Sequence, residues 1–319
     1  MSLSPLLSRC WRPASSVQFV RCLNTARPVF VSEPAERGYA FDVTYDFERS
    51  PFKDISVGHT RIRLPKFETE QAEERYRKEH LAAVFRILAR EGHAEGIAGH
   101  CSVRSAIDPS QFYINPWTKS FHRMRASDLV LVNGDGTVVD EPRYPQGCSV
   151  DASATGLHAP IYRMAKDVQS IVHVHGPYSK AFSALGKPIE MINQDACAFH
   201  DCIIDVGFEG LVVDESEGAQ IVAKMTPSTK IALLQNHGSL ALGRTSPDEA
   251  AWWFLSFEKV CRAQLLVMAA LKEGEKPILV NDEARDFTLK SMGTPAMGWL
   301  GFAGYYEQEE WESSGDFKF

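Results

Sequence analysis

Two histidines, His173 and His175, lie two residues apart in the short apolar run Ile171-Val172-His173-Val174-His175. Alternate residues of a β-strand point to the same side, so a strand here presents both imidazoles on one face. Two neighbouring imidazoles are suitable ligands for one metal ion. The same pattern also arises in strands that bind no metal, so it identifies a candidate site only.

A third histidine follows a second apolar run. Leu233-Leu234-Gln235-Asn236-His237-Gly238 reads as a strand that delivers His237 into a glycine-containing turn. Three histidines at strand ends form a facial ligand set for Zn(II), our first choice, or Fe(II), and leave open positions for a substrate. The sequence therefore predicts a divalent-metal site made by His173, His175 and His237.

The elements that would hold this site alternate between helices and strands. Helical periodicity covers 69–91 and about 250–271, where Ser246, Pro247 and Glu249 predict the start of the second helix with a capping box. A helix is also expected over 152–166 and another around 218–225. Strand-like runs occur at 101–103, 112–114, 129–132, 138–139, 171–175, 203–206, 211–213 and 231–234. This interleaving predicts one α/β domain over residues 68–275.

Length and composition set broad limits. The 319 residues carry 44% hydrophobic residues and a net charge of -7, values of an ordinary globular protein without the basic character of a nucleic-acid binder. No apolar run is long enough for a membrane helix. Seven cysteines without a CxxC pair argue against a disulfide framework, and we expect reduced thiols.

The two ends of the chain differ from its centre. Residues 1–32 contain four arginines and several serines but no acidic residue, a composition typical of a mitochondrial transit peptide. A mitochondrial location is therefore expected, with the cytoplasm as the alternative. Residues 33–67 read as an extended arm and residues 276–319 as an irregular acidic and aromatic tail.

Four segments together resemble the class II aldolase/adducin domain: GIAGHCSVR at 96–104, SDLVLVNGDGTVV at 127–139, LHAPIYRMAKDVQSIVHVH at 157–175 and LLQNHGSLALG at 233–243. The resemblance covers about residues 70 to 272. It implies a three-layer α/β/α sandwich around a mixed, largely antiparallel sheet, a homotetramer and a small-molecule substrate. Catalytic members such as L-fuculose-phosphate aldolase hold zinc with histidines that match His173, His175 and His237.

Several positions depart from the sugar-phosphate aldolases. Ala154 stands where a catalytic glutamate is expected, with Asp151 one turn earlier as a helix N-cap, and Gln194 stands where a tyrosine donates a proton. The neighbouring Asp195 is then the candidate acid or base, and Gln194 a group that orients the substrate.

The phosphate-binding loops are altered as well. His100 replaces an asparagine, and Trp117 and Thr118 replace a Thr-Gly pair, while Lys119 and Arg104 keep positive charge nearby. His100, Trp117, Thr118 and Lys119 are thus the expected substrate-binding residues. An apolar indole in place of a bare backbone argues against a sugar phosphate.

Three functions remain open from the sequence. The first is a metal-dependent lyase, a decarboxylase or an aldolase, that works through a metal-stabilised enolate. The second is an Fe(II)-dependent oxidative decarboxylase, and the third is a non-catalytic scaffold like the adducin head. Retention of all three histidines favours an enzyme.

Overall fold

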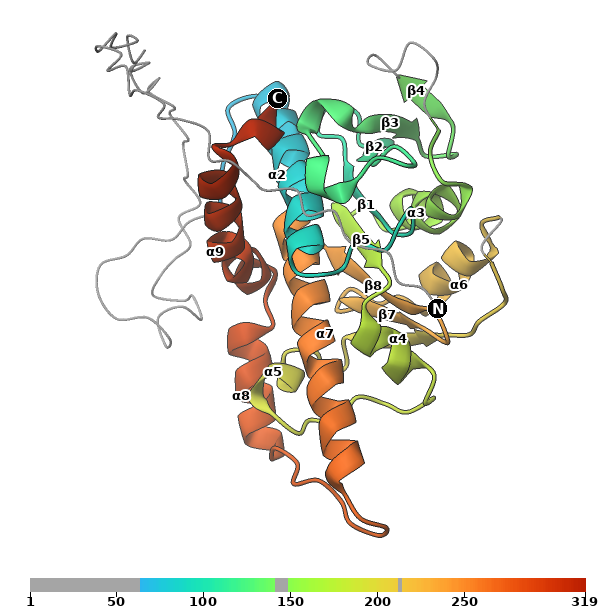
Figure 1. The fold of residues 1–319 in the computed structure, drawn as a ribbon, viewed down its shortest axis with the longest axis vertical. Coiled ribbons are helices and arrows are strands. Elements are labelled where there is room, and N and C mark those ends of the chain that lie inside the picture. The colour runs from blue at the N-terminus through green and yellow to red at the C-terminus, as the bar shows by residue number, and fades with distance from the viewer. Residues whose placement is uncertain (1–63, 141–148, 212–213) are drawn as a thin grey trace, which may run out of the picture. The chain divides into compact units, whose positions relative to one another are not determined.

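The computed structural model describes residues 64–140, 149–211 and 214–319, which build one eight-stranded sheet and the helices on its two faces (Figure 1). The strand order is β4-β3-β2-β1-β5-β8-β7-β6, and every neighbouring pair is antiparallel except the parallel pair β6–β7. The strands are β1 (His100–Arg104), β2 (Gln111–Ile114), β3 (Val130–Asn133), β4 (Val138–Asp140), β5 (Ser170–Val174), β6 (Ile203–Val206), β7 (Ile231–Leu234) and β8 (Gly238–Gly243).

Helices cover both faces of this sheet and complete a three-layer α/β/α sandwich. They are α2 (Glu70–Arg90), α3 (Ala152–Met164), α4 (Pro177–Ser183), α5 (Gln194–Cys197), α6 (Ser216–Lys224), α7 (Pro247–Ala270), α8 (Asp282–Met292) and α9 (Pro295–Ser313). Short 3-10 helices span Phe121–Arg123, Ala126–Asp128 and Asp316–Lys318. The fold expected from the sequence is confirmed.

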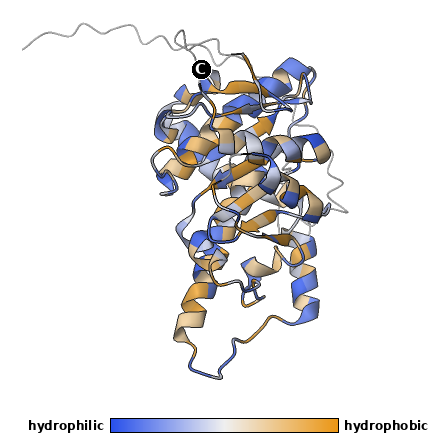
Figure 2. Ribbon diagram, turned by 90° about the vertical axis from the view of Figure 1, so that its right-hand side faces the viewer, coloured by the Kyte–Doolittle hydropathy of each residue, from blue (hydrophilic) through white to orange (hydrophobic). Residues whose placement is uncertain are grey.

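Alternation along the central strands divides the core into two halves. Cys101 and Val103 of β1 pack with α2, α7 and α9 on one face, while Ile171 of β5 and Leu242 of β8 pack with α3 and α6 on the other. Figure 2 shows hydrophobic residues concentrated in the strands and a mixture of both kinds on the covering helices. The sheet is buried on both faces, which is why its strands read as nearly continuous apolar runs.

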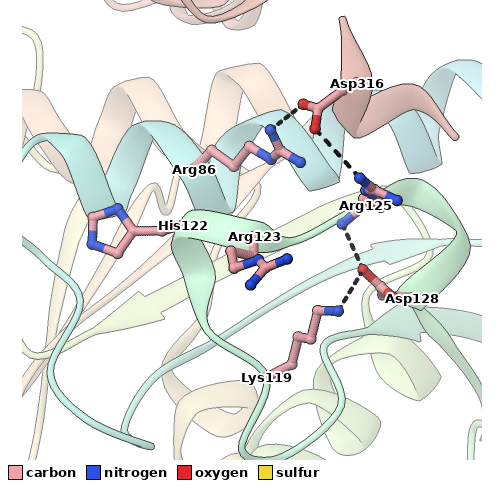
Figure 3. Close-up of a pocket in the computed structure, with 7 residues that line it drawn as sticks. All are labelled: Arg86, Lys119, His122, Arg123, Arg125, Asp128 and Asp316. Atoms are coloured by element: carbon pink, nitrogen blue, oxygen red, sulfur yellow. Dashed lines mark hydrogen bonds and ion pairs between the residues drawn. The ribbon is translucent and has the colours of Figure 1, made fainter. Parts of the chain in front are cut away.

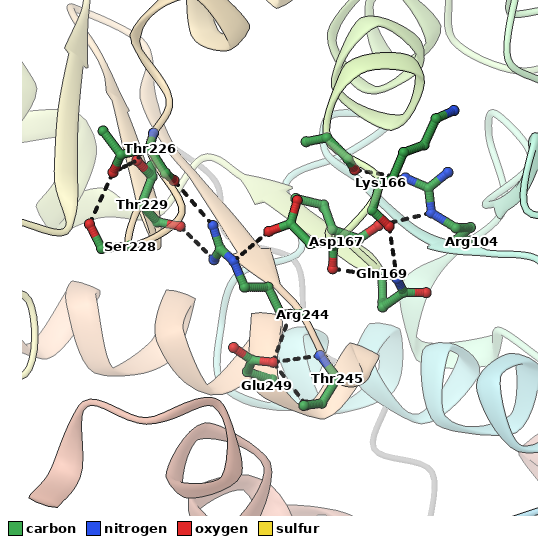
Figure 4. Close-up of polar contacts among 12 residues, drawn as sticks. Arg104, Lys166, Asp167, Gln169, Thr226, Ser228, Thr229, Arg244, Thr245 and Glu249 are labelled. Carbon is green, nitrogen blue, oxygen red and sulfur yellow. Dashed lines mark hydrogen bonds and ion pairs between the residues drawn. The ribbon is translucent and has the colours of Figure 1, made fainter. Parts of the chain in front are cut away.

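Two arginines near the ends of β1 and β8 donate hydrogen bonds to main-chain carbonyl oxygens of neighbouring segments (Figure 4). Arg104 donates to the carbonyl oxygens of Val168 at 3.0 Å and Tyr162 at 3.0 Å, and Arg244 donates to that of Thr229 at 2.7 Å. Burial of these carbonyls requires donors, and a guanidinium supplies several in one plane. Arg104, whose positive charge the sequence placed near the altered phosphate-binding loops, thus donates its hydrogen bonds to main-chain oxygens.

The C-terminal segment differs from its prediction. Residues 276–319 were expected to be irregular, but α8 and α9 occupy most of them, and α9 packs on α7 and α2. The glycines that weaken the helical pattern of α9 are the reason for the error. A Cβ on Gly298 would lie 2.8 Å from a Trp253 ring atom, so the missing side chain permits close helix packing.

The structure confirms some of the other predicted elements and differs from the rest. The predicted strands at 203–206 and 231–234 and the helix starting near Ser246 are confirmed, with Ser246 accepting from the Glu249 amide. The Glu249 side chain, however, accepts from the amides of Arg244 and Thr245 at 2.7 Å. No strand forms at Leu211, and 212–213 lie outside the described residues. The same holds for 1–32 and for the arm up to residue 63.

Candidate metal centre

Strand β5 and the turn between β7 and β8 bring the three histidines together. His173 lies within β5, opposite Leu240 of β8, and His175 directly follows the strand. His237 follows Asn236, whose φ of 57° is in the left-handed region. The amide of His237 donates to the Leu234 carbonyl at 3.1 Å and closes the turn. Since β8 pairs with both β5 and β7, the tight turn places His237 beside the end of β5.

The three imidazoles face a common point. Each offers one ring nitrogen, and these atoms all lie within 4.8 Å of one another. The Nε2 atoms of His175 and His237 are 3.1 Å apart. Two nitrogens bound to zinc at about 2.0–2.1 Å would be separated by about 2.9 Å at a right angle and about 3.3 Å at the tetrahedral angle. The separation of this pair fits two ligands of one divalent cation.

Outer contacts lie behind each ring, although His237 Nδ1 has no hydrogen-bond partner among the described residues. His173 donates from Nδ1 to the Ser239 carbonyl at 3.0 Å, so its Nε2 keeps a free lone pair. The Nδ1 atoms of His175 and His237 face the carboxylates of Glu95 at 3.4 Å and Glu217 at 3.7 Å. Carboxylate or carbonyl groups behind the rings are typical of metal-binding histidines.

The electrostatics of the cluster favour neutral rings. Burial lowers the pKa of His173 well below its ordinary value, and the neighbouring histidines lower it further. Burial, followed by His237, also lowers the pKa of His175. Because the neutral imidazole is the form that binds metal, the protein holds these ligands ready for a cation near neutral pH.

A buried polar chain extends behind the cluster. His100 packs against His173 with ring centroids 4.8 Å apart, and its Nδ1 shares a hydrogen bond of 2.8 Å with His158 Nε2. His158 Nδ1 lies 2.7 Å from Ser102 Oγ, which lies 2.8 Å from the Tyr162 hydroxyl. Burial lowers the pKa of His158 to about 3 and raises that of Tyr162, so this chain is neutral.

The turn after His175 is held by a buried carboxylate. Glu258 of α7 accepts from the amides of Tyr178 at 3.0 Å and Ser179 at 2.7 Å, at the start of α4. Gly176 leaves the space for it, because a Cβ there would lie 2.2 Å from the Glu258 carboxyl carbon. These contacts fix the backbone beside His175.

The expected substrate-binding residues divide into two groups. His100 lies next to the cluster, whereas Trp117 is 42% exposed and Thr118 has a left-handed φ of 71°. Lys119 contacts Asp128 at 3.2 Å and lines a basic pocket of about 210 Å³ that also contains Arg123 (Figure 3). Lys119 therefore makes its polar contact outside the histidine cluster.

Gln194 and Asp195 do not reach the cluster. Both are exposed at the start of α5, whose neighbours are α7 and α8. Within the described ranges, no hydrogen bond or ion pair joins either residue to a cluster histidine. Ala154 of α3 is buried in the apolar core, and Asp151 is the expected N-cap, accepting from the Ser153 amide at 2.9 Å.

The sequence did not identify the carboxylates near the histidines. Glu95 lies in the loop before β1, and Glu217 lies in α6, remote in sequence from the ligands that they face. Neither occurs in a spacing that would link it to a histidine. The pairing of β1 with β5 brings the loop of Glu95 near His175, and the packing of α6 on α3 helps to place Glu217.

The chain thus combines a mixed α/β/α sandwich with three histidines that could hold a metal ion at the end of its central strands. A family profile described as "Class II Aldolase and Adducin N-terminal domain" matches residues 79–265. That match covers more than half of the chain, which therefore belongs to this family. The expected resemblance is confirmed.

Similar proteins come from fungi and bacteria. "Meiotically up-regulated gene 14 protein" of Schizosaccharomyces pombe is 38% identical over 67% of this chain and 81% of its own length. "Decarboxylase NovR" of Streptomyces niveus is 34% identical over 76% of this chain and 87% of its own. "4-hydroxy-3-prenylphenylpyruvate oxygenase/4-hydroxy-3-prenylbenzoate synthase" of Streptomyces roseochromogenus subsp. oscitans is 34% identical over 76% and 85%.

A solved structure shares the fold closely. "L-fuculose 1-phosphate aldolase from Glaciozyma antarctica PI12" superposes with a TM-score of 0.71 and 34% identity, covering 79% of this chain and 96% of that one. The relatives support a protein of the lyase or decarboxylase type. Among the described residues, no helix is both long and apolar enough to cross a bilayer.

Proposed function

We propose that this chain is a divalent-metal-dependent carbon–carbon lyase of the decarboxylase type that acts on a small carbonyl or carboxylate substrate. The observation that carries the proposal is the convergence of His173, His175 and His237, whose ligand atoms lie within 4.8 Å of one another. Zn(II) is the first choice of ion, because three neutral imidazoles with an open position are a common catalytic zinc site.

A divalent cation in this position supplies a Lewis acid that polarises a carbonyl and stabilises the negative charge that develops when a neighbouring bond breaks. The chain itself holds and orients the ligands. Ser239 fixes the tautomer of His173, and the carboxylates of Glu95 and Glu217 lie behind the other two rings. Glu258 keeps the backbone after His175 in place.

Decarboxylation suits the residues better than aldol cleavage. An aldol cleavage needs a group that removes a hydroxyl proton, but Ala154 stands at the expected position of the glutamate and is buried in the core. Loss of carbon dioxide needs no base to begin. The relative named "Decarboxylase NovR" supports this choice.

The loop residues argue for a substrate without a phosphate group. The Nδ1 of His100 is already hydrogen-bonded to His158, and the side chain is only 3% exposed. This nitrogen is therefore not available to a phosphate. Trp117 adds an apolar ring at the second loop. A structural neighbour is nevertheless titled as a fuculose-phosphate aldolase, so a phospho-sugar belongs among the compounds tested.

An Fe(II)-dependent oxidative decarboxylase is the second candidate. The relative named as an oxygenase and benzoate synthase favours it, and an all-histidine site without a carboxylate ligand is compatible with iron. The two functions differ in their need for oxygen. An adducin-like scaffold, the third possibility from the sequence, predicts neither metal nor turnover.

The first experiment measures metal content and activity on the full chain. Elemental analysis after anaerobic purification should give one divalent metal per chain, and His175→Ala should lose it. His200→Ala is the matched control, because His200 is half-buried and pairs with Asp201 outside the cluster. Absence of metal from the intact protein after incubation with zinc or ferrous salt would refute the proposal.

The second experiment identifies the reaction. Release of carbon dioxide from a panel of aromatic and aliphatic oxo acids, with and without oxygen, separates the lyase from the oxidative enzyme. L-fuculose 1-phosphate is included, and its saturable cleavage would refute the exclusion of sugar phosphates.

Location and assembly are further parts of the proposal. We propose import into mitochondria directed by residues 1–32, and a homotetramer as the assembly. A fluorescent protein fused to these 32 residues should enter mitochondria, and light scattering of the full chain should give four times its mass of 35.6 kDa. A cytoplasmic fusion protein or a monomer would contradict the respective statement.

A further inference from the structure

A second pocket lies among the helices α2, α7 and α9. Its cavity measures about 300 Å³ and shares no lining residue with the histidine cluster. Pockets that bind small molecules typically begin at about this volume and combine apolar walls with a few polar groups. The residues that line this pocket point to a definite kind of ligand.

Aromatic rings form its walls in a fixed arrangement. The imidazole of His80 lies between Tyr76 and Tyr306, with ring centroids at 3.8 Å and 4.0 Å, and it is stacked on Tyr306. Trp299 donates from its indole nitrogen to the Tyr76 hydroxyl at 3.1 Å. These contacts hold the aromatic walls in place before a ligand binds, which lowers the cost of ordering them.

One carboxylate that lines this pocket has an oxygen without a hydrogen-bond partner among the described residues. Asp248 lies in the first turn of α7, and its Oδ1 contacts His80 Nδ1 at 2.7 Å. Its Oδ2 is buried and has no hydrogen-bond partner among the described residues, and the side chain is only 3% exposed. A buried carboxylate oxygen without a donor costs roughly 1–3 kcal/mol or more, and a ligand with an N–H group would remove that cost.

The charge of the pocket agrees with a cationic ligand. Asp248, Glu79, Glu307 and Glu310 line it, and the basic residues that line it are Lys318, which pairs with Glu310, and His80. Negative charge together with aromatic faces is the combination that binds organic cations. An anion would face these carboxylates, and a neutral ligand would offer them no positive charge.

We propose that this pocket binds a small organic ammonium ion. The ammonium donates a hydrogen bond to Asp248 Oδ2, and the apolar part of the ligand packs against Tyr76, Trp299 and Tyr306. A primary or secondary amine fits, whereas a quaternary ammonium has no N–H to offer Asp248. The site is independent of the proposed lyase function, because none of its residues contacts the metal ligands.

The experiment uses three probes of one shape and different charge. Phenethylammonium, 2-phenylethanol and phenylacetate are titrated into the full chain, and binding is followed by calorimetry and by the tryptophan fluorescence to which Trp299 contributes. We expect saturable binding of phenethylammonium, at least tenfold weaker binding of the alcohol, and none of phenylacetate. Equal binding of the cation and the alcohol would overturn the proposal, as would no binding of the cation.

Variants locate the binding. Asp248→Asn should weaken phenethylammonium binding at least tenfold. Ala303→Leu should block it by filling the cavity; Ala303 is exposed, so the change leaves the core intact if Asp248→Asn fails to fold. Glu273→Gln, an exposed carboxylate beyond the pocket, is the control and should have no effect.

Two outcomes of these variants decide the matter. Undiminished binding in Ala303→Leu would place the ligand elsewhere and overturn the proposal. His175→Ala should bind phenethylammonium like the unmodified chain, so a failure of the metal site and a failure of this pocket are distinguished.

Discussion

Replacement of Gly176 by alanine tests how the backbone beside the metal ligands is held. In Gly176→Ala the new methyl carbon would lie 2.2 Å from the Glu258 carboxyl carbon and 2.3 Å from one of its oxygens. The carboxylate must therefore move. It cannot then keep both of its bonds to the amides of Tyr178 and Ser179.

The size of the effect follows from those two bonds. A hydrogen bond to a charged group contributes about 1.5–3 kcal/mol, so loss of one or both predicts a decrease of about 2–6 kcal/mol in the free energy of unfolding. A typical domain is stable by about 5–15 kcal/mol, so the variant should fold but unfold at clearly lower urea concentration. Metal affinity should fall as well, because Gly176 directly follows His175.

A double-mutant cycle measures the contact itself. Urea unfolding in EDTA is compared for Gly176→Ala, Glu258→Ala and the double variant. Glu258→Ala already loses both bonds and leaves room for the methyl group, so the added alanine at 176 should cost little in its presence. Gly207→Ala is the control, because nothing lies within 4 Å of that Cβ. Additive costs, or a loss below about 1 kcal/mol in Gly176→Ala, would refute the reasoning.

Three further predictions concern stability. Gly298→Ala should destabilise the protein by about 1–3 kcal/mol, because the new Cβ would lie 2.8 Å from Trp253. Gly304→Ala in the same helix has open space around its Cβ and should stabilise the protein by up to about 1 kcal/mol. Equal shifts of the two melting temperatures would contradict this difference. The pKa of His158 falls from 6.5 to about 3 on folding, so the unfolded chain takes up a proton that the folded chain does not. The contribution of His158 to stability should therefore be complete above pH 6.5 and decrease as the pH falls, by up to about 1.4 kcal/mol per pH unit. In urea titrations between pH 5 and 7.5, His158→Gln should reduce the slope of stability against pH by up to this amount; an unchanged slope would exclude a contribution from His158. Asp151→Ala should cost about 1 kcal/mol through loss of the N-cap of α3, and a midpoint of urea unfolding that does not move would exclude that role.

The sequence predicted the elements whose pattern is local. Alternating or continuous apolar runs marked the strands, and the spacing of His173 and His175 marked a candidate site, because both depend only on the period of a strand. The helix α9 was missed because its glycines and aromatic residues have low intrinsic helix propensity. Packing on Trp253 and its neighbours outweighs that propensity, and packing is not visible in the sequence.

The surroundings of the site were beyond sequence reasoning for a similar reason. Glu217 faces His237 only because α6 packs on α3, and the carbonyl of Ser239 faces His173 only through the register of β5 and β8. Resemblance to relatives suggested His100 as a substrate contact, and the structure places it in a hydrogen-bonded chain with His158. Such contacts require the three-dimensional arrangement.

The antiparallel pairing of β5 with β8 has a consequence for the order of events during folding. His175 and His237 are 62 positions apart along the chain, and they meet only after these strands have paired. Closing a connection of that length is slow compared with local steps such as helix formation. A partly folded chain therefore brings together at most two of the three histidines, and the complete cluster forms only when the centre of the sheet is complete.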